Sequence, residues 1–376
     1  MELTSEHLAL QNEVRIFVDN EIIPFASEYD KKQFLPLDII QKLSQKGYLG
    51  TLLPQEYGGR GMRMLDHAIL HEEIGRGCSS VRSLLTVHGM LVIAIQKWGT
   101  RSQCDFWLKK LASGRSIGAF ALTEPNVGSD AKSIETTAVS SGDEYIINGT
   151  KKWITFGQIA DVFLLIAKLE GKPTAFLVEK NRPGLSIKPM SGLLGCRASG
   201  TAELNFQECR IPQSNLIGNP GFGLSHVALN SLDYGRYSIA CGAVGLGQAC
   251  LEECLHYARK RKQFGEPLRQ HQLIQKIVTE MVVNIKAGRL LCYHAGILKD
   301  DGVPESIMET WNAKYFTTTM LQKITSDAIQ IHGANGCSNQ FQVERFYRDA
   351  KIMEVIEGTT QMHEILIATN AFRSMA

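Results

Sequence analysis

A change of hydrophobic period falls at Phe120-Ala121-Leu122-Thr123-Glu124-Pro125-Asn126-Val127-Gly128-Ser129-Asp130. Before this stretch, apolar residues recur every three or four positions, as they do in amphipathic helices. After it they alternate or form short blocks, as they do in strands. Helical spacing returns near residue 221. The 376-residue sequence therefore predicts a helical domain at 1–117, a β domain at 118–220 and a second helical domain at 221–376.

The N-terminal region has clear helix signals. Apolar residues within 10–18 fall on one helical face. A further helix is predicted to begin near Pro36 and to stop at Gly47, because proline fits a first helical turn and glycine a helix end. The cluster Gly58-Gly59-Arg60-Gly61 could cradle a phosphate, but no predicted strand precedes it, which favours an ordinary loop.

The central region has the signals of a compact antiparallel β domain. Asn148-Gly149 lies between two apolar blocks and predicts a tight turn. Residues 162–167 and 175–178 are continuous apolar runs, and 202–207 alternates apolar with polar residues like a half-buried strand.

The C-terminal region is predicted to be a helical bundle. Apolar residues within 273–285 form a wide helical face, and the small residues of 242–247 predict close helix packing. Those glycines do not follow the GxGxxG order, so a dinucleotide-binding βαβ unit is not expected. Long helices joined by short loops favour an antiparallel four-helix bundle. The predicted fold class is therefore α+β.

Composition narrows the functional classes. Forty basic and thirty-eight acidic residues give a net charge of +2, which offers no electrostatic footprint for nucleic acid or an anionic membrane. Residues 1–6 are acidic and polar rather than secretory or transit-like, and no apolar run is long enough to span a bilayer. Nine cysteines without a CxxC pair indicate reduced thiols and no metal site. A cytoplasmic protein is expected.

Four ordered motifs carry a family resemblance. Residues 120–130 closely resemble the TEPxxGSD signature of acyl-CoA dehydrogenases, and Trp153-Ile154-Thr155, 261–265 and 347–359 resemble further motifs of that family. The resemblance covers essentially the whole chain and is closest to the short-chain members. It implies a helix–sheet–helix fold, FAD as cofactor, an acyl thioester substrate, an electron acceptor such as an electron-transfer flavoprotein, and a homo-oligomer, either a dimer or a tetramer.

The resemblance also implies which residues surround the flavin. An isoalloxazine needs hydrogen bonds at its polar edge and packing on its face. The residues implied to bind the cofactor within one chain are Phe120, Leu122, Thr123, Gly128, Ser129, Trp153, Ile154, Thr155, Thr359 and Gln361. The alternative for Trp153 is an aromatic residue of the β-domain core.

A second set is implied to reach the FAD of a neighbouring subunit. The guanidinium group of Arg261 could donate two charge-assisted hydrogen bonds to a pyrophosphate. The alternative interpretation is that Arg261 belongs to a solvated basic helix end. The other implied members are Gln263, Phe264, His271, Gln272, Gln330, Gly333 and Ala334. Ala334 stands where many members of the family have a second glycine.

Glu357 is the candidate catalytic base. Removing a proton α to a thioester needs a carboxylate in a dry pocket, where desolvation raises its pKa. Some members of the family carry the base on an earlier helix instead. Here that position is Gly235, which has no side chain to serve, so Glu357 is expected to act. Its alternative is an ordinary loop carboxylate. Ile356 replaces a tyrosine that often precedes the base.

Arg82 is the candidate specificity residue. Its segment resembles the stretch in which glutaryl-CoA dehydrogenases hold the distal carboxylate of their substrate. A guanidinium in an apolar pocket needs a polar or anionic partner. The alternative is an ion pair with Glu72 or Glu73. The resemblance further implies substrate contacts by Ser129, Asp233 and Arg236.

The resemblance leaves three alternative functions. One is a dehydrogenase acting on a short polar acyl group bound to an acyl carrier protein, as in hydroxymalonyl-type polyketide extender-unit biosynthesis. Another is an acyl-CoA oxidase, although such oxidases usually carry a large additional C-terminal domain. The last is a non-catalytic or nucleic-acid-associated member of the same fold, against which the net charge and Glu357 both argue.

Overall fold

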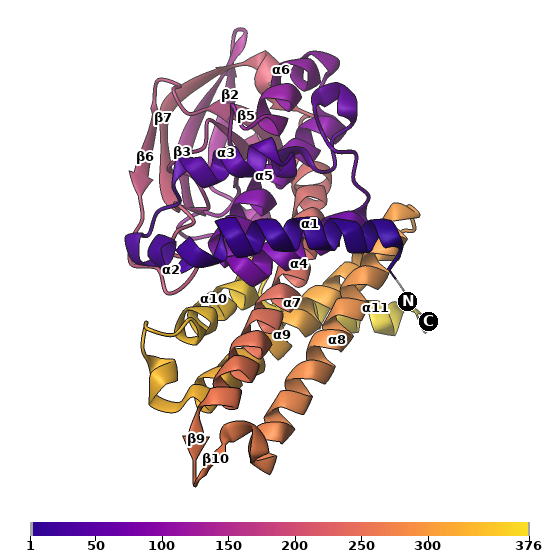
Figure 1. Cartoon of the computed structure of the whole chain (residues 1–376). Helices are drawn as coiled ribbons and strands as arrows, with labels where there is room; N and C mark the ends of the chain where they lie inside the picture. The colour runs from indigo at the N-terminus through magenta and orange to yellow at the C-terminus, as the bar shows by residue number, and fades with distance from the viewer. Residues whose placement is uncertain (1–2, 375–376) are drawn as a thin grey trace.

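The computed structural model describes residues 3–374, so the first two residues of the acidic N-terminal stretch and the last two of the chain lie outside it. The N-terminal region is helical, as predicted, and lies across the middle and top of Figure 1. Pro36 caps a helix and Gly47 ends the same segment with a φ of 71°. The helices of this region are α1 (Ser5–Glu21), α2 (Ile23–Lys32), α3 (Leu37–Gln45), α4 (Met64–Gly77), α5 (Ser79–Trp98) and α6 (Arg101–Ala112).

Helix α5 is the central helix of this region. By length and composition alone it could cross a membrane, but 89% of its most apolar window is buried inside the protein. Leu84, Leu91 and Ile95 are fully buried and face neighbouring helices and the sheet. We therefore describe α5 as a core helix.

The β domain is one eight-stranded sheet with the order β6-β7-β3-β2-β4-β5-β8, and β1 pairs with β4 off this path. Most neighbours are antiparallel, as predicted, but β1–β4 and β2–β4 are parallel. The strands are β1 (Gly118–Ala121), β2 (Thr137–Ser141), β3 (Glu144–Ile154), β4 (Val162–Leu169), β5 (Lys172–Glu179), β6 (Leu185–Pro189), β7 (Ala202–Pro212) and β8 (Leu216–Ile217).

The predicted turn at Asn148-Gly149 is wrong. Strand β3 runs straight through it, and the register with β7 shifts between Ile147 and Gly149. Gly149 has a φ of 144°, and a Cβ there would lie 2.7 Å from the Thr136 backbone. The dipeptide therefore marks a bulge, where glycine permits a close backbone approach. The tight turn lies instead at Glu170 and Gly171, between β4 and β5, where both residues have positive φ.

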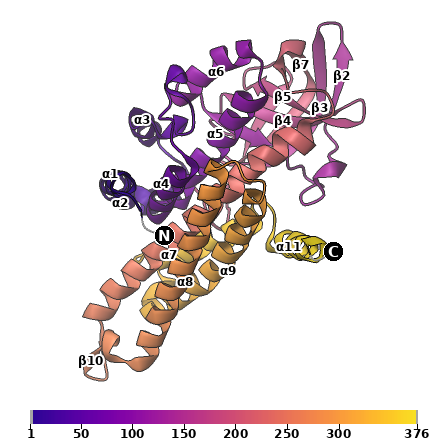
Figure 2. The same ribbon diagram turned by 90° about the vertical axis from the view of Figure 1, so that its right-hand side faces the viewer.

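The C-terminal region begins with a π-helical turn, Gly223–Ala228, that leads directly into α7. Helices α7, α8 and α9 run side by side away from the β domain, while α11 stands to one side (Figure 2). The elements are α7 (Leu229–Lys260), β9 (Lys262–Gln263), β10 (Glu266–Pro267), α8 (Gln272–Asp300), α9 (Ser306–His332), α10 (Val343–Val355) and α11 (Thr360–Ser374).

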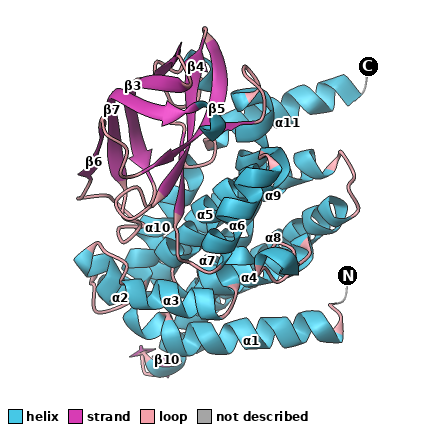
Figure 3. Ribbon diagram, turned by 90° about the horizontal axis from the view of Figure 1, so that it is seen from above, coloured by secondary structure: helices cyan, strands magenta, loops and turns pink. Residues whose placement is uncertain are grey.

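The expected close helix packing occurs between α4 and α7. A Cβ on Gly245 would lie 1.9 Å from the Glu72 carbonyl oxygen, and one on Gly75 would lie 2.6 Å from that of Gly242. The glycines therefore let the two helix backbones touch. This contact joins the N-terminal helices to the bundle, and Figure 3 shows the sheet set beside the helices rather than within them.

Candidate active site

Glu357 lies in the short turn between α10 and α11. Its φ is 56° and that of Gly358 is 96°, so two consecutive residues occupy the left-handed region. A non-glycine residue held in such a conformation costs roughly 1–3 kcal/mol, and such residues cluster at functional sites. The surrounding structure must therefore fix this turn.

The carboxyl group of Glu357 lies against α7. The residue is half-buried, but its Oε2 is shielded from solvent and has no hydrogen-bond partner. A Cβ on Gly235 would stand 2.7 Å from that oxygen and 3.1 Å from the Met90 Sδ. Gly235 therefore leaves the space that the carboxyl group occupies.

Burial and three nearby cations act in opposite directions on the pKa of this carboxyl group. Burial raises the pKa of Glu357 to about 7, and the positive charges of Arg236, Lys314 and Arg82 oppose that rise. These cations come from α7, α9 and α5, so three helices converge on one carboxyl group. An unpartnered oxygen that ionises near neutral pH is suited to accept a proton from carbon.

Arg82 is fully buried, and its partners are hydroxyl groups. It donates from Nη1 to Thr86 Oγ1 at 2.9 Å and from Nη2 to Ser83 Oγ at 3.0 Å, while its Nε has no partner. A Cβ on Gly242 would lie 2.2 Å from the Arg82 Cδ, so this glycine makes room for the side chain. Desolvation lowers the pKa of Arg82.

The alternative pairing of Arg82 is wrong. The Glu72 carboxylate accepts from Arg289 Nε at 2.8 Å, and the Glu73 carboxylate accepts from Arg76 Nε at 2.8 Å. Both acids are thus paired elsewhere, because α4 directs them toward α8 and α1. Arg82 remains a buried cation close enough to Glu357 to affect its pKa.

The other two predicted substrate residues on α7 are engaged with protein groups. Asp233 is ion-paired with Lys299, although its Oδ1 is buried without a partner. Arg236 donates from Nε to the Glu357 carbonyl oxygen at 3.0 Å and lies 4.9 Å from the centre of the Trp311 ring. Arg236 therefore holds the backbone of the candidate base.

The predicted flavin-edge loop is held by a buried ion pair that the sequence analysis missed. Lys151 donates from Nζ to Glu124 Oε1 at 2.7 Å and to the Leu122 carbonyl oxygen at 2.9 Å. The Thr123 carbonyl oxygen accepts from the Lys152 N–H at 2.8 Å. The sequence signal that could have revealed this pair is a lysine between apolar stretches of a predicted strand. These bonds fix the loop that carries Thr123.

The residues beside this loop fit a planar aromatic cofactor. Trp153 has a φ of 63° and is 51% exposed, which excludes the alternative that it is a core aromatic residue. A Cβ on Gly128 would meet nothing within 4 Å, and Ser129 is exposed. Thr155 is half-buried and Ile154 is buried beneath the strand. An exposed ring, open space and nearby hydroxyl groups together suit an isoalloxazine.

Four further members of the predicted flavin set lie nearer the core or near the turn that holds Glu357. Phe120 and Leu122 pack in the clusters that also hold α5 residues. Thr359 is half-buried, and its carbonyl oxygen is 2.9 Å from His363 Nδ1. Gln361 is exposed at the start of α11.

The second predicted set lies far from the first. The β9–β10 hairpin and the start of α8 form the tip of the long helices, opposite the β domain (Figure 1). Phe264 in this hairpin is 96% exposed with a φ of 52°. The loop after α9 packs against the end of α7, since Asn335 Nδ2 donates to the Tyr257 hydroxyl at 2.9 Å. Also exposed or half-buried here are Arg261, Gln263, His271, Gln272, Gln330, Gly333 and Ala334.

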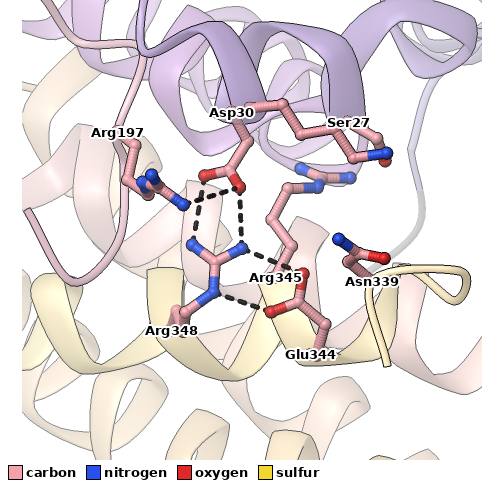
Figure 4. A pocket seen from close by; sticks show the side chains of 8 residues that line it. Ser27, Asp30, Arg197, Asn339, Glu344, Arg345 and Arg348 are labelled. Carbon is pink, nitrogen blue, oxygen red and sulfur yellow. Dashed lines mark hydrogen bonds and ion pairs between the residues drawn. The ribbon is translucent and has the colours of Figure 1, made fainter. Parts of the chain in front are cut away.

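One cavity of about 170 Å³ lies away from all these residues (Figure 4). Asp30 of α2 accepts from Arg348 Nη2 of α10 at 2.7 Å, and Arg348 Nε donates to Glu344 at 2.7 Å. Ion pairs line much of the cavity wall. They link α2 to α10, the helix that precedes Glu357. Its lining residues are Ser27, Asp30, Lys31, Arg197, Asn339, Glu344, Arg345 and Arg348.

Over residues 3–374, no group of three or more His, Cys, Asp or Glu side chains is arranged to hold a metal ion. Eight of the nine cysteines are buried, and all nine are free.

Three family models match successive parts of the chain. The acyl-CoA dehydrogenase N-terminal domain matches residues 4–115, the middle domain 119–209 and the C-terminal domain 223–372. The chain therefore belongs to the acyl-CoA dehydrogenase family, whose members use FAD.

Known proteins and solved structures are similar to this chain over nearly its full length. The chain is 38% identical to the mitochondrial short-chain specific acyl-CoA dehydrogenase of Rattus norvegicus over 100% of this chain and 92% of that protein. A glutaryl-coenzyme A dehydrogenase solved with glutaryl-CoA is 34% identical with a TM-score of 0.95, covering 99% and 96% of the two chains. The prolyl acyl carrier protein oxidase AnaB is 29% identical with a TM-score of 0.94, covering 98% of this chain and 100% of that one.

Proposed function

We propose that this chain is an FAD-dependent acyl thioester dehydrogenase in which Glu357 removes the α-proton of the substrate. The observation that carries this proposal is the Glu357 carboxyl group, with a buried, unpartnered Oε2 and a pKa raised to about 7. A carboxylate in that state has a high proton affinity and no competing hydrogen bond at Oε2.

Residues of this chain would bind the cofactor and position the base. The loop fixed by Glu124 and Lys151, together with Trp153, would hold the isoalloxazine. Bound FAD supplies the acceptor for the β-hydride. Arg236 and Gly235 position Glu357, one by holding its carbonyl oxygen and the other by leaving room for its carboxyl group. The proton moves from the substrate α-carbon to a Glu357 carboxylate oxygen.

The distal hairpin supports an oligomer. Phe264 is almost fully exposed, and Arg261 is exposed at the end of α7. The β9–β10 hairpin lies at the opposite end of the long helices from the β domain, whose strand β3 contains Trp153 (Figure 1). We propose that these residues complete the FAD site of a second copy, and that an electron-transfer flavoprotein accepts the electrons.

A second candidate concerns the acyl group. Arg82 is a fully buried cation whose partners are neutral hydroxyl groups, and burying an unpaired charge is costly. A carboxylated or hydroxylated acyl group would offset that cost. The likeness to AnaB, named as a carrier protein oxidase, supports a carrier-bound thioester as the alternative to a CoA ester.

The test is anaerobic mixing of the purified holoenzyme with thioesters while flavin absorbance is followed. Bleaching by any acyl thioester is expected, and its absence across short acyl-CoA and acyl-carrier-protein substrates would contradict the proposed function. Preference for hydroxylated or carboxylated groups that Arg82→Ala removes would support the second candidate. Rapid turnover of butyryl-CoA by the wild type would contradict it.

A further inference from the structure

Lys314 is a buried cation that the proposed mechanism does not yet use. It lies on the inner face of α9, and its side chain is fully buried. Its Nζ donates to the Gly358 carbonyl oxygen at 2.8 Å and approaches that of Glu354 at 3.4 Å. Both acceptors are main-chain groups rather than carboxylates. Burying an ammonium group is costly unless nearby groups offset its lost hydration.

The two acceptors flank Glu357. Glu354 lies in the last turn of α10, and Gly358 follows the base directly. Arg236 holds the Glu357 carbonyl oxygen at 3.0 Å. Two cations from α7 and α9 thus hold consecutive carbonyl oxygens in a turn whose two residues both have positive φ. A strained turn persists only where its surroundings determine it.

We propose that Lys314 is a positioning residue for the base: its ammonium group fixes the carbonyl group of Gly358, the residue after Glu357, and its charge favours the ionised carboxylate. This proposal rests on the proposed role of Glu357. Lys314 touches neither substrate nor cofactor in it, and acts only through the turn and through its electric field.

The charges around Glu357 support a specific effect of Lys314. Desolvation lowers the pKa of Lys314 to about 8, and Glu357 opposes that fall. The ammonium group is therefore charged where Glu357 begins to ionise. The remaining facing groups are Arg236 on α7, Arg82 on α5, Glu354 on α10 and His363 on α11, the last with a pKa lowered to about 4.

Arg82, Arg236 and Lys314 each lower the pKa of Glu357. Removing the Lys314 charge therefore raises that pKa, and the acid limb of the rate profile moves to higher pH. An opposite charge nearby typically shifts a carboxyl pKa by about 1–3 units. A purely structural lysine would leave the limb in place and change only stability.

The experiment compares Lys314→Met, Lys314→Gln and Lys314→Arg with Lys323→Met. Lys323 lies on the same helix but is 58% exposed and pairs with Glu280 and Asp327. Each holoenzyme is assayed for flavin content, thermal stability, and kcat and KM between pH 5.5 and 9. The Glu357 carboxyl infrared band, assigned by difference from Glu357→Gln, reports ionisation without turnover.

For Lys314→Gln we expect normal flavin content, an acid limb and infrared transition raised by about 1 unit, and roughly tenfold lower kcat at low pH with little change in KM. Lys314→Met should lose more kcat because the Gly358 carbonyl oxygen loses its donor. Lys314→Arg and Lys323→Met should keep the wild-type midpoint.

An unshifted limb in folded Lys314→Gln and Lys314→Met would overturn the proposal. Failure of both variants to fold would also overturn it, since the proposal assigns Lys314 to the turn rather than to folding. If Glu357→Gln itself retains wild-type activity, the proposed function fails instead, and the infrared transition still reports on Lys314.

Discussion

The turn around Glu357 is enclosed by groups of the same chain, whereas the hairpin that follows Arg261 is open to solvent. At the turn, α5, α7 and α9 supply the three positive charges that lower the pKa of the carboxyl group, and Gly235 leaves the space for it. At the hairpin, Phe264 is 96% exposed and Arg261 lies in the open. This contrast fits our proposal that one chain holds the groups for proton abstraction, whereas the cofactor site is completed by a second copy.

The first prediction tests the turn at its centre. Glu357→Gln should lose about 10²–10⁴-fold in the rate of anaerobic flavin reduction, because the amide cannot take a proton. Flavin content and thermal stability should stay near wild type, since the side chain is nearly isosteric. Stopped-flow absorbance measures the rate. Reduction at the wild-type rate would require another base.

The second prediction tests the space beside the base. Gly235→Ala places a Cβ 2.7 Å from the Glu357 Oε2, so the carboxyl group must move. A displacement of about 1 Å can cost about 10²-fold in rate, while alanine favours the helix by about 1 kcal/mol. We expect lower kcat without loss of thermal stability.

The matched control is Gly247→Ala on the same helix. A Cβ there would meet Ile285 at 3.4 Å, an ordinary contact. It should therefore keep wild-type kcat. Equal kcat in both alanine variants would show that Gly235 has no role in placing the base.

The third prediction tests the hairpin. Arg261→Ala should weaken FAD binding by about 10–100-fold, since hydrogen bonds to charged groups contribute about 1.5–3 kcal/mol. Assembly should weaken as flavin is lost. Flavin titration and size-exclusion chromatography measure both effects. Lys260→Ala, the adjacent exposed lysine, is the control, and an unchanged Arg261→Ala oligomer with full flavin would contradict the cross-subunit site.

The order of the three regions was predictable from sequence because their hydrophobic periods differ. The parallel pairings of β1 and β2 with β4 were not, since strand periodicity carries no information about direction. Asn148-Gly149 misled because glycine serves a bulge as readily as a turn. The sequence motifs pointed to Glu357 as the candidate base. They could not predict its pKa, because that depends on Lys314 and Arg82, which lie 43 and 275 positions away in the sequence.

The last prediction, with the smallest expected effect, compares how flavin reduction and FAD retention depend on pH. Glu357 must be ionised to accept a proton, and its pKa is about 7. The rate of flavin reduction at saturating substrate should therefore rise with pH and be half-maximal near pH 7. Lowering the pH from 8 to 6 should cut the rate by about tenfold, because each pH unit below the pKa reduces the ionised fraction about tenfold. FAD retention should not follow this curve, since the pKa of Glu357 governs only the turn. A flat rate profile from pH 6 to 8 would place the base elsewhere, whereas flavin loss along the same curve would show that the turn and the cofactor site are not separate.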